Sequence, residues 1–364
     1  MRLVASVGLL FFCVFAISLQ SVEAADKVVL VAGATAEKAD AKMPVDAKSA
    51  KLDGPFAVDF NRDGTLLLVE MKGQRVLAVD KNGSLRTLGG NGSKGAAGDG
   101  GPVSQATFNG MHHLAVGLDG VVYIADTWNN RIRKIDARLQ SIEPFAGTGD
   151  KGFSGDGGPA AKAEFGGVYC LALTPSADKL YIADLDNRRI RCIDMTSGVV
   201  STVAGNGERG VPKDGAEAVH APLVDPRAVT ADDKGNVYIL ERSGNALRVV
   251  DATGKIRTLV GPGVTTCKDE QGKSPLPMKG PKHLCMDLDG NVLIADTENH
   301  LIRKYLPGVN KLVRVAGTGK AGAKGLDGPP LEVELNQPHG VYVHPAGALY
   351  IADSTNNRVL KITP

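Results

Sequence analysis

The chain has 364 residues and a formal net charge of +2, from 42 lysine and arginine residues against 40 aspartate and glutamate residues. This balance provides no global field to attract nucleic acid or an anionic membrane, so a polyanionic partner would need a local basic patch. Length alone would suggest two or three domains. The 45 glycine residues make internal repeats the first pattern to test.

The first segment, residues 1–24, has the pattern of a cleaved secretory signal. An apolar run from Leu3 to Ile17 follows the basic Arg2, and VEA at 22–24 offers small residues at the two positions that a signal peptidase reads. An apolar run of about 15 residues is too short to span a membrane. We therefore expect cleavage after Ala24 and a secreted or periplasmic mature protein, residues 25–364, without a membrane span.

The rest of the chain contains one motif six times. Its clearest copy, VVYIADTWNNRIRKID at 121–136, is an apolar run that ends on an acidic residue, followed by a polar turn and a second run. The equivalent acidic residues, spaced by 55 to 58 positions, are Glu70, Asp126, Asp184, Glu241, Asp296 and Asp353. A fixed period of this length indicates a repeat architecture rather than separate domains.

Each repeat contains four short strands in chain order. In the second repeat we expect strands at 112–117, 121–126, 131–136 and 141–147, with an Asp119-Gly120 hairpin turn after the first. Alternating apolar residues, β-branched residues and tight turns are typical of antiparallel strands. Four such strands repeated six times predict an all-β protein, a single six-bladed β-propeller over residues 25–364.

The two ends of the mature chain are expected to share one blade. The sixth repeat stops after three strands, whereas KVVLVAG at 27–33 is similar to the fourth strand of other repeats, such as STVAG at 201–205. We predict that Val28 to Val31 pairs with Val359 to Ile362. This closure would leave no terminal blade free to peel away from the ring.

Four cysteines remain after signal cleavage. Cys170 and Cys192 fall on non-adjacent strands of one predicted sheet, too far apart for a disulfide. Cys267 and Cys285 are less constrained, because Cys267 lies in a predicted loop. Their state is left open between a disulfide and two buried free thiols.

The repeats resemble NHL repeats, and the fifth spells the name in Asn299-His300-Leu301. The loop GTGDKGFSGDGGPAAKAEF at 147–165 is similar to loops of bacterial exported NHL proteins. This resemblance covers the mature chain and implies the propeller fold. It leaves function open, because NHL proteins and their six-bladed relatives include RNA binders, protein-interaction modules, extracellular sensors, lactonases and a zinc-dependent lyase.

The repeated acidic residue is interpreted as part of the scaffold. Its carboxylate can accept hydrogen bonds from turn amides and can pair with an arginine five residues later. These arginines are Arg75, Arg131, Arg189 and Arg358, while Ala246 and Leu301 replace them in repeats four and five. One pocket at the ring centre does not need six equivalent carboxylates, so we expect no catalytic role for them.

The glycine-rich connections between blades also have a structural interpretation. They lack the Lys-Ser or Lys-Thr of a phosphate-binding loop. Their recurring acidic residues are Asp99, Asp156, Asp214 and Asp327. Turn formation explains these residues, and no alternating acidic loop points to calcium.

Function is expected where the repeats differ, at the start of each first strand, which opens on the central channel. The first ring of aligned positions is Phe56, His112, Tyr169, Arg227, Lys282 and His339. The next ring is Ala57, His113, Cys170, Ala228, His283 and Gly340. The third is aliphatic and is assigned to the core: Val58, Leu114, Leu171, Val229, Leu284 and Val341. The chemistry of the first ring predicts a channel-mouth site for an anionic or polar ligand.

A metal centre is the competing hypothesis. The candidate ligands are His112, His113, His283 and His339, and a catalytic zinc needs about three protein ligands. Resemblance to the zinc-dependent amidating lyase adds Tyr169, whereas Phe56 and Arg227 stand where further polar groups would be wanted. A lactonase with a divalent cation would depend on Asp59, the one inner-strand carboxylate without equivalents.

The leading prediction is an exported, monomeric module that binds a small molecule or a protein through its loop face and channel mouth. The alternative is a metal-dependent hydrolase or lyase, lactonase-like or amidating-lyase-like, with zinc or calcium at the central channel. The basic turns NNRIRK at 129–134 and NRRIRC at 187–192 would suit RNA. Export and near-neutral charge argue against a nucleic-acid partner.

Overall fold

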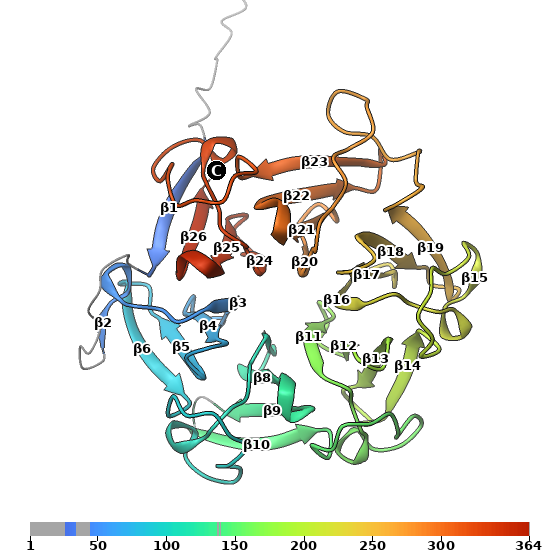
Figure 1. Ribbon diagram of the computed structural model, residues 1–364. Coiled ribbons are helices and arrows are strands. Elements are labelled where there is room, and N and C mark those ends of the chain that lie inside the picture. Colours follow the sequence, from blue (N-terminus) through green and yellow to red (C-terminus); the bar gives the residue numbers. More distant parts are fainter. Residues whose placement is uncertain (1–25, 34–43, 137, 139, 364) are drawn as a thin grey trace, which may run out of the picture.

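The structure is a computed structural model that describes residues 26–33, 44–136, 138 and 140–363. Six antiparallel sheets stand around a central axis, and the first strand of each repeat lies nearest to it (Figure 1). The prediction of an all-β, six-bladed propeller is confirmed. The predicted signal segment, residues 1–24, lies outside the described residues. Within the described ones, no helix has the length and apolar character needed to cross a membrane.

Blades one to three follow each other along the chain, each with its strands ordered outward from the axis. Blade one contains β3 (Pro55–Phe60), β4 (Leu66–Glu70), β5 (Arg75–Val79), β6 (Ser84–Gly89) and the short β2 (Val45–Asp46). Blade two contains β7 (His113–Val116), β8 (Val121–Asp126), β9 (Arg131–Asp136) and β10 (Ser141–Ala146). Blade three contains β11 (Val168–Leu173), β12 (Lys179–Asp184), β13 (Arg189–Asp194) and β14 (Val200–Ala204).

Blades four to six complete the ring. Blade four contains β16 (Pro226–Ala231), β17 (Val237–Glu241), β18 (Ala246–Val250), β19 (Lys255–Val260) and the short β15 (Ala216–Glu217). Blade five contains β20 (His283–Met286), β21 (Val292–Asp296), β22 (Leu301–Leu306) and β23 (Lys311–Ala316). Blade six contains β24 (Gly340–Val343), β25 (Leu349–Asp353), β26 (Arg358–Thr363) and β1 (Lys27–Ala32).

Single turns of 3-10 helix connect these strands. Three lie between the second and third strands of a blade: η3 (Thr127–Asn129), η6 (Thr297–Asn299) and η8 (Ser354–Asn356). The others lie in the connections between blades: η1 (Ala47–Ser49), η2 (Val103–Gln105), η4 (Ala160–Lys162), η5 (Ala218–His220) and η7 (Pro330–Glu332).

The first and last strands of the described chain pair as predicted. Val28 faces Ile362 and Leu30 faces Leu360, with a bulge at Val31 before Ala32 meets Val359. Val28 is fully buried, so β1 adds apolar contacts as well as backbone hydrogen bonds. The ring is therefore closed within blade six.

The repeated acidic residues are buried and link neighbouring segments of each blade by hydrogen bonds. Each is 0% exposed and accepts a backbone N–H from the segment that leads into the first strand of its blade. In blade two, Asp126 accepts the N–H of Asn109 at 2.8 Å and an amide N–H of Asn129 at 2.8 Å. The residue four positions after each acidic residue is left-handed: Gln74, Asn130, Arg188, Asn245, His300 and Asn357. Asparagine tolerates this conformation better than most residues, which explains the Asn-rich turns.

The predicted ion pairs with these acidic residues are confirmed in part. Arg75 and Arg358 each meet their carboxylate at 2.7 Å, and Arg131 lies 3.5 Å from its own. The pairing is wrong for Arg189, whose guanidinium donates to two backbone carbonyls. Asp184 instead meets Arg191 at 3.5 Å. Positions five and seven residues after the acidic residue lie on the same face of the third strand, and blades two to five place a buried arginine at the second of them.

The glycine-rich connections are tied to the same arginines. Asp99 meets Arg133 at 2.7 Å and Asp156 meets Arg191 at 2.8 Å. These carboxylates therefore link each connection to the third strand of the following blade, which supports their structural interpretation.

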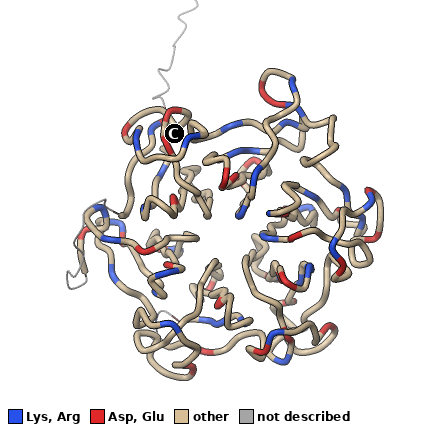
Figure 2. The backbone as a smooth tube through the Cα atoms, in the orientation of Figure 1, with Lys and Arg blue, Asp and Glu red and all other residues tan. Residues whose placement is uncertain are grey.

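Apolar side chains fill the space between neighbouring blades. The third ring of aligned positions is buried, at 0 to 4% exposure, which confirms its assignment to the core. All four described cysteines are free thiols, so Cys267 and Cys285 form no disulfide. Figure 2 shows basic and acidic residues interspersed around the ring, as the near-neutral net charge implies.

Candidate functional site at the channel mouth

The six residues predicted for the channel mouth lie next to one another. Phe56 stacks on His339 with ring centroids 4.1 Å apart and meets the edge of His112 at 5.1 Å. The rings of His112 and Tyr169 are 4.7 Å apart. The Arg227 guanidinium carbon lies 4.5 Å from the centre of the Tyr169 ring, and Lys282 Nζ lies 3.2 Å from His339 Nε2. A continuous chain of contacts thus runs from Arg227 around the mouth to Lys282.

Two histidines of this ring present lone pairs. His112 Nδ1 lies 2.7 Å from the carbonyl of Gly110, and His339 Nδ1 lies 2.8 Å from that of Gln337. Because a carbonyl can only accept, each Nδ1 carries the proton and each Nε2 is an acceptor in the neutral ring. Burial is the main reason why the pKa of both histidines is well below its usual value, and the nearby cations Arg227 and Lys282 add to it. Both rings are therefore neutral near pH 7.

The two cations of the mouth, Arg227 and Lys282, are largely shielded from water. Arg227 is 4% exposed, and burial lowers its pKa to about 10. Burial, followed by repulsion from Arg227, lowers the pKa of Lys282 to about 8. Both groups are still mainly protonated at neutral pH, so the mouth carries positive charge close to apolar and aromatic surface.

A second ring closes the channel below the mouth. His113 of blade two and His283 of blade five meet with their Nε2 atoms 2.6 Å apart and their rings 4.5 Å apart. Each Nδ1 faces a backbone N–H of the next blade, from Leu171 at 3.4 Å and from Val341 at 3.2 Å. Blades two and five therefore face each other across the channel.

This histidine pair belongs to a three-residue cluster that includes a cysteine. The ligand atoms of His113, Cys170 and His283 lie within 4.8 Å of one another. Among the described residues this is the one such cluster of three or more potential ligands. The sequence placed Cys170 in the ring but did not identify it as a ligand. The other metal candidates, His112 and His339, lie in the first ring.

The cluster fits a metal ion only in part. Imidazole nitrogen and thiolate are good zinc ligands. However, an Nε2 that binds metal leaves the ring proton on Nδ1, and here each Nδ1 faces an amide donor. Burial also raises the pKa of the Cys170 thiol to about 11, which favours the protonated form. Metal binding would thus require these contacts to rearrange.

Trp128 stands at the mouth but lies outside the predicted ring. Its indole is 46% exposed and lies 5.5 Å from the His112 ring. The other side of the indole packs on Gly110, where a Cβ would collide with it. The residue follows Asp126 by two positions, and the equivalents are Lys72, Asp186, Ser243, Glu298 and Thr355. Comparing the six repeats at this position would have shown another set of residues that differ from blade to blade.

Asp59 lies deeper in the channel wall, three positions after Phe56 in β3. Its carboxylate accepts the N–H of Phe60 at 2.7 Å and that of Val116 in the next blade at 2.8 Å. Burial raises its pKa to about 6. Asp59 is not part of a cluster of three or more metal-binding groups in the described chain.

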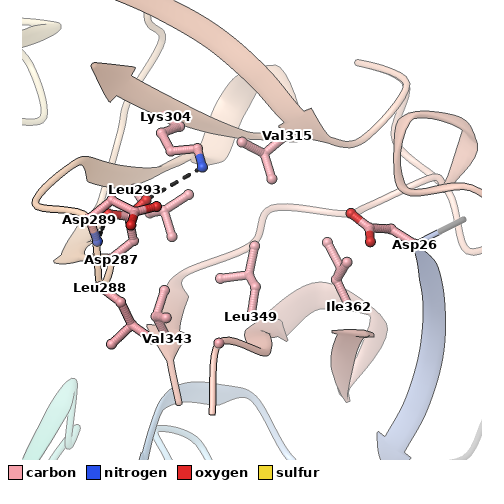
Figure 3. A pocket seen from close by; sticks show the side chains of 11 residues that line it. Asp26, Asp287, Leu288, Asp289, Leu293, Lys304, Val315, Val343, Leu349 and Ile362 are labelled. Atoms are coloured by element: carbon pink, nitrogen blue, oxygen red, sulfur yellow. Dashed lines mark hydrogen bonds and ion pairs between the residues drawn. The ribbon is translucent and has the colours of Figure 1, made fainter. Parts of the chain in front are cut away.

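Two cavities lie away from the mouth. Figure 3 shows one of about 290 Å³ against blades five and six. Its carboxylate Asp287 is already used by two amides of its own turn, by the Asn291 side chain at 2.9 Å and by Lys304 at 3.4 Å. The second, of about 360 Å³, is formed by the loop after β19 and is mainly apolar. Neither cavity includes a residue of the two rings.

Sequence comparisons show which known proteins this chain is similar to. The NHL repeat model matches residues 335–362 and the Teneurin NHL domain model matches residues 195–280. The chain is 28% identical to Protein SUPPRESSOR OF QUENCHING 1, chloroplastic, of Arabidopsis thaliana over 71% of its length, and 26% identical to NHL repeat-containing protein 2 of Gallus gallus over 85%. It spans 25% and 46% of these two relatives.

Solved structures show the same fold at low sequence identity. An auxiliary nutrient binding protein from Bacteroides ovatus has a TM-score of 0.65 at 15% identity, covering 93% of this chain and 77% of its own. A structure described as streptogramin B lyase has a TM-score of 0.52 at 12% identity, covering 93% and 98%. The family-model matches thus show NHL repeats within this chain, and the solved structures share its six-bladed β-propeller fold.

Proposed function

We propose that this protein is an exported binding module whose ligand lies at the channel mouth. The observation that carries the proposal is the chain of contacts among six residues of five types, at positions where a purely structural sixfold repeat would keep similar residues. Repeated units specify shape, whereas a site is built where the repeat is broken. The mouth joins cations, neutral histidine acceptors and aromatic faces, which suits a polar ligand.

The structural neighbours and the N-terminal sequence support the same proposal. The Bacteroides ovatus neighbour is described as an auxiliary nutrient binding protein, and this chain begins with a segment that has the pattern of a signal. Mass spectrometry of the protein recovered from outside the cytoplasm should give an N-terminus at Ala25. Recovery of the uncleaved chain from the cytoplasm would contradict export.

The binding proposal can be tested with two mouth variants. His112→Ala and His339→Ala should fold and should lose thermal stabilisation by whichever compound in a small-molecule library stabilises the wild-type protein. His220→Ala is the matched control, because that histidine is exposed on η5, in the connection between blades three and four, and makes none of the contacts described at the mouth. Loss of folding in both mouth variants would assign these histidines to the scaffold instead.

A metal-dependent lyase or hydrolase is the second candidate function. The cluster of His113, Cys170 and His283 favours it, and the streptogramin B lyase neighbour shows that this fold occurs in a protein described as a lyase. A zinc ion there would be held by two imidazoles and one thiolate and would supply Lewis-acid chemistry. The residues around it would bind and orient the substrate at the mouth.

Elemental analysis separates the two functions. Protein purified without chelators should contain stoichiometric zinc if the second candidate is correct, and Cys170→Ala should lose most of it. Cys192→Ala is the control, since this thiol is also buried but lies outside the cluster. Protein without metal at this stage would exclude the metal-dependent enzyme.

A further inference from the structure

Six arginines are buried in the described residues, and five of them share one arrangement. Each of the five has a carboxylate partner on its own blade or the connection to it. The pairs are Arg133 with Asp99 at 2.7 Å, Arg191 with Asp156 at 2.8 Å, Arg248 with Glu241 at 2.5 Å, Arg303 with Asp296 at 3.1 Å and Arg358 with Asp353 at 2.7 Å. This is the usual condition for a buried charge.

The sixth, Arg227, has no carboxylate partner among the described residues. Its guanidinium donates one hydrogen bond, from Nη1 to the carbonyl of Tyr169 at 3.3 Å, and its Nε has no acceptor. The acidic residue nearest in sequence, Asp225, is already engaged by Arg242 at 2.9 Å and by the Ser243 hydroxyl at 2.6 Å. Arg227 is therefore a buried cation with donors to spare.

A second cation, Lys282, lies at the same mouth as Arg227. Lys282 Nζ makes one contact with a neutral acceptor, His339 Nε2. Arg227 is buried and Lys282 is partly buried, and neither forms an ion pair with a carboxylate among the described residues. Asp225 and Glu298 offset the two charges only from a distance. An anion bound between the two cations would therefore stabilise the protein.

We infer that the mouth binds a small organic anion, a carboxylate or a phosphate ester, held by the Arg227 guanidinium and the Lys282 ammonium. A guanidinium offers two parallel N–H donors that match these groups, and the ammonium supplies a second charge. His112 Nε2 accepts a hydroxyl donor of the ligand, and the exposed face of Trp128 receives its body. This inference rests on the proposed binding function and specifies the class of ligand.

Thermal stability of the mature protein provides the test, with inorganic phosphate, glucose 6-phosphate and glucose as probes. Both anions should raise the Tm of the wild-type protein, and glucose should leave it unchanged. Arg227→Met should itself raise the Tm by about 2 to 4 °C, because it removes an uncompensated buried charge, and should lose the response to both anions. Arg227→Lys should keep the response with about tenfold weaker affinity, because the bidentate geometry is lost.

A charge-matched control comes from the same blade. Arg257→Met removes one exposed cation on β19 and should keep the full anion response. The inference is overturned if Arg227→Met responds to phosphate like the wild-type protein, or if neither anion stabilises the wild-type protein. A neutral library compound whose stabilisation depends on His112 would overturn the inference while leaving the proposed binding function intact. If no compound stabilises the wild-type protein, both the anion inference and the proposed binding function are contradicted.

Discussion

Arg248 and Arg227 are buried arginines of the same blade, yet their surroundings differ. Arg248 lies on the third strand and meets Glu241 in an arrangement that recurs around the ring. Arg227 starts the innermost strand and meets a tyrosine ring and a single carbonyl. The first arrangement compensates the charge within the protein, whereas the second leaves the guanidinium without a carboxylate partner among the described residues. The comparison shows that burial of a charged residue marks a site only when no internal partner is present.

The largest expected effect lies in the scaffold. Arg248→Met leaves the Glu241 carboxylate buried without a cation and should lower the free energy of unfolding by about 3 to 5 kcal/mol. Urea denaturation measures this value. The double variant with Glu241→Gln should recover much of the loss, since it removes the orphaned charge. If Arg248→Met is as stable as the wild-type protein, Arg248 does not compensate a buried charge and the contrast with Arg227 fails.

Asp59 is intermediate between the two arginines, because its carboxylate accepts hydrogen bonds from two amides and from Tyr342 but has no cation partner among the described residues. Its pKa is raised to about 6, so its stabilising contribution is fully present below the unfolded value of 3.8 and is lost as pH rises through about 6. Each pKa unit corresponds to about 1.36 kcal/mol. Relative to Asp59→Asn, the wild-type protein should thus lose about 2 kcal/mol between pH 4 and pH 7. Parallel pH profiles for the two proteins would contradict this result.

The pH dependence of anion binding tests whether the charge of Lys282 contributes to the proposed site. The pKa of Lys282 is lowered to about 8, so the lysine loses its charge as pH rises through that value. Affinity for sulfate, whose own charge is constant in this range, should fall by about tenfold between pH 7 and pH 9. In Lys282→Met the affinity should be lower and independent of pH in this range. Isothermal titration calorimetry measures both.

The smallest expected effect concerns Trp128. Because its indole is 46% exposed, Trp128→Ala should change the free energy of unfolding by no more than about 0.5 kcal/mol. Affinity for sulfate should be unchanged, whereas affinity for an anion with a ring, such as glucose 6-phosphate, should fall. A loss of sulfate binding would show that the indole positions the cations rather than the body of the ligand.

The sequence was sufficient for those features that repetition specifies. Six copies of one motif predict the blades, their axis and the pairing of Val28 with Ile362, because each copy repeats the same hydrogen-bonding pattern. Aligning the copies also brings the six mouth residues to one level. Repetition is less informative where two positions serve the same role, as with Arg189 and Arg191, which lie on the same face of β13.

Contacts across the channel could not be predicted in the same way. The short distance between His113 and His283 depends on the ring diameter and on side-chain orientation, neither of which is encoded within one repeat. The isolation of Arg227 is likewise a property of its neighbours, since Asp225 could have been its partner until Arg242 and Ser243 were seen to occupy it.

The pairing of β1 with β26 determines when, during synthesis of the chain, the channel mouth can form. The strand made first in the described chain finds its partner in the strand made last, so a growing chain holds an incomplete ring. Arg227, Lys282 and His339 emerge in that order, and His339 precedes the closing strand. The proposed site is therefore complete only in the closed ring, and we expect a chain truncated before β26 to bind no ligand.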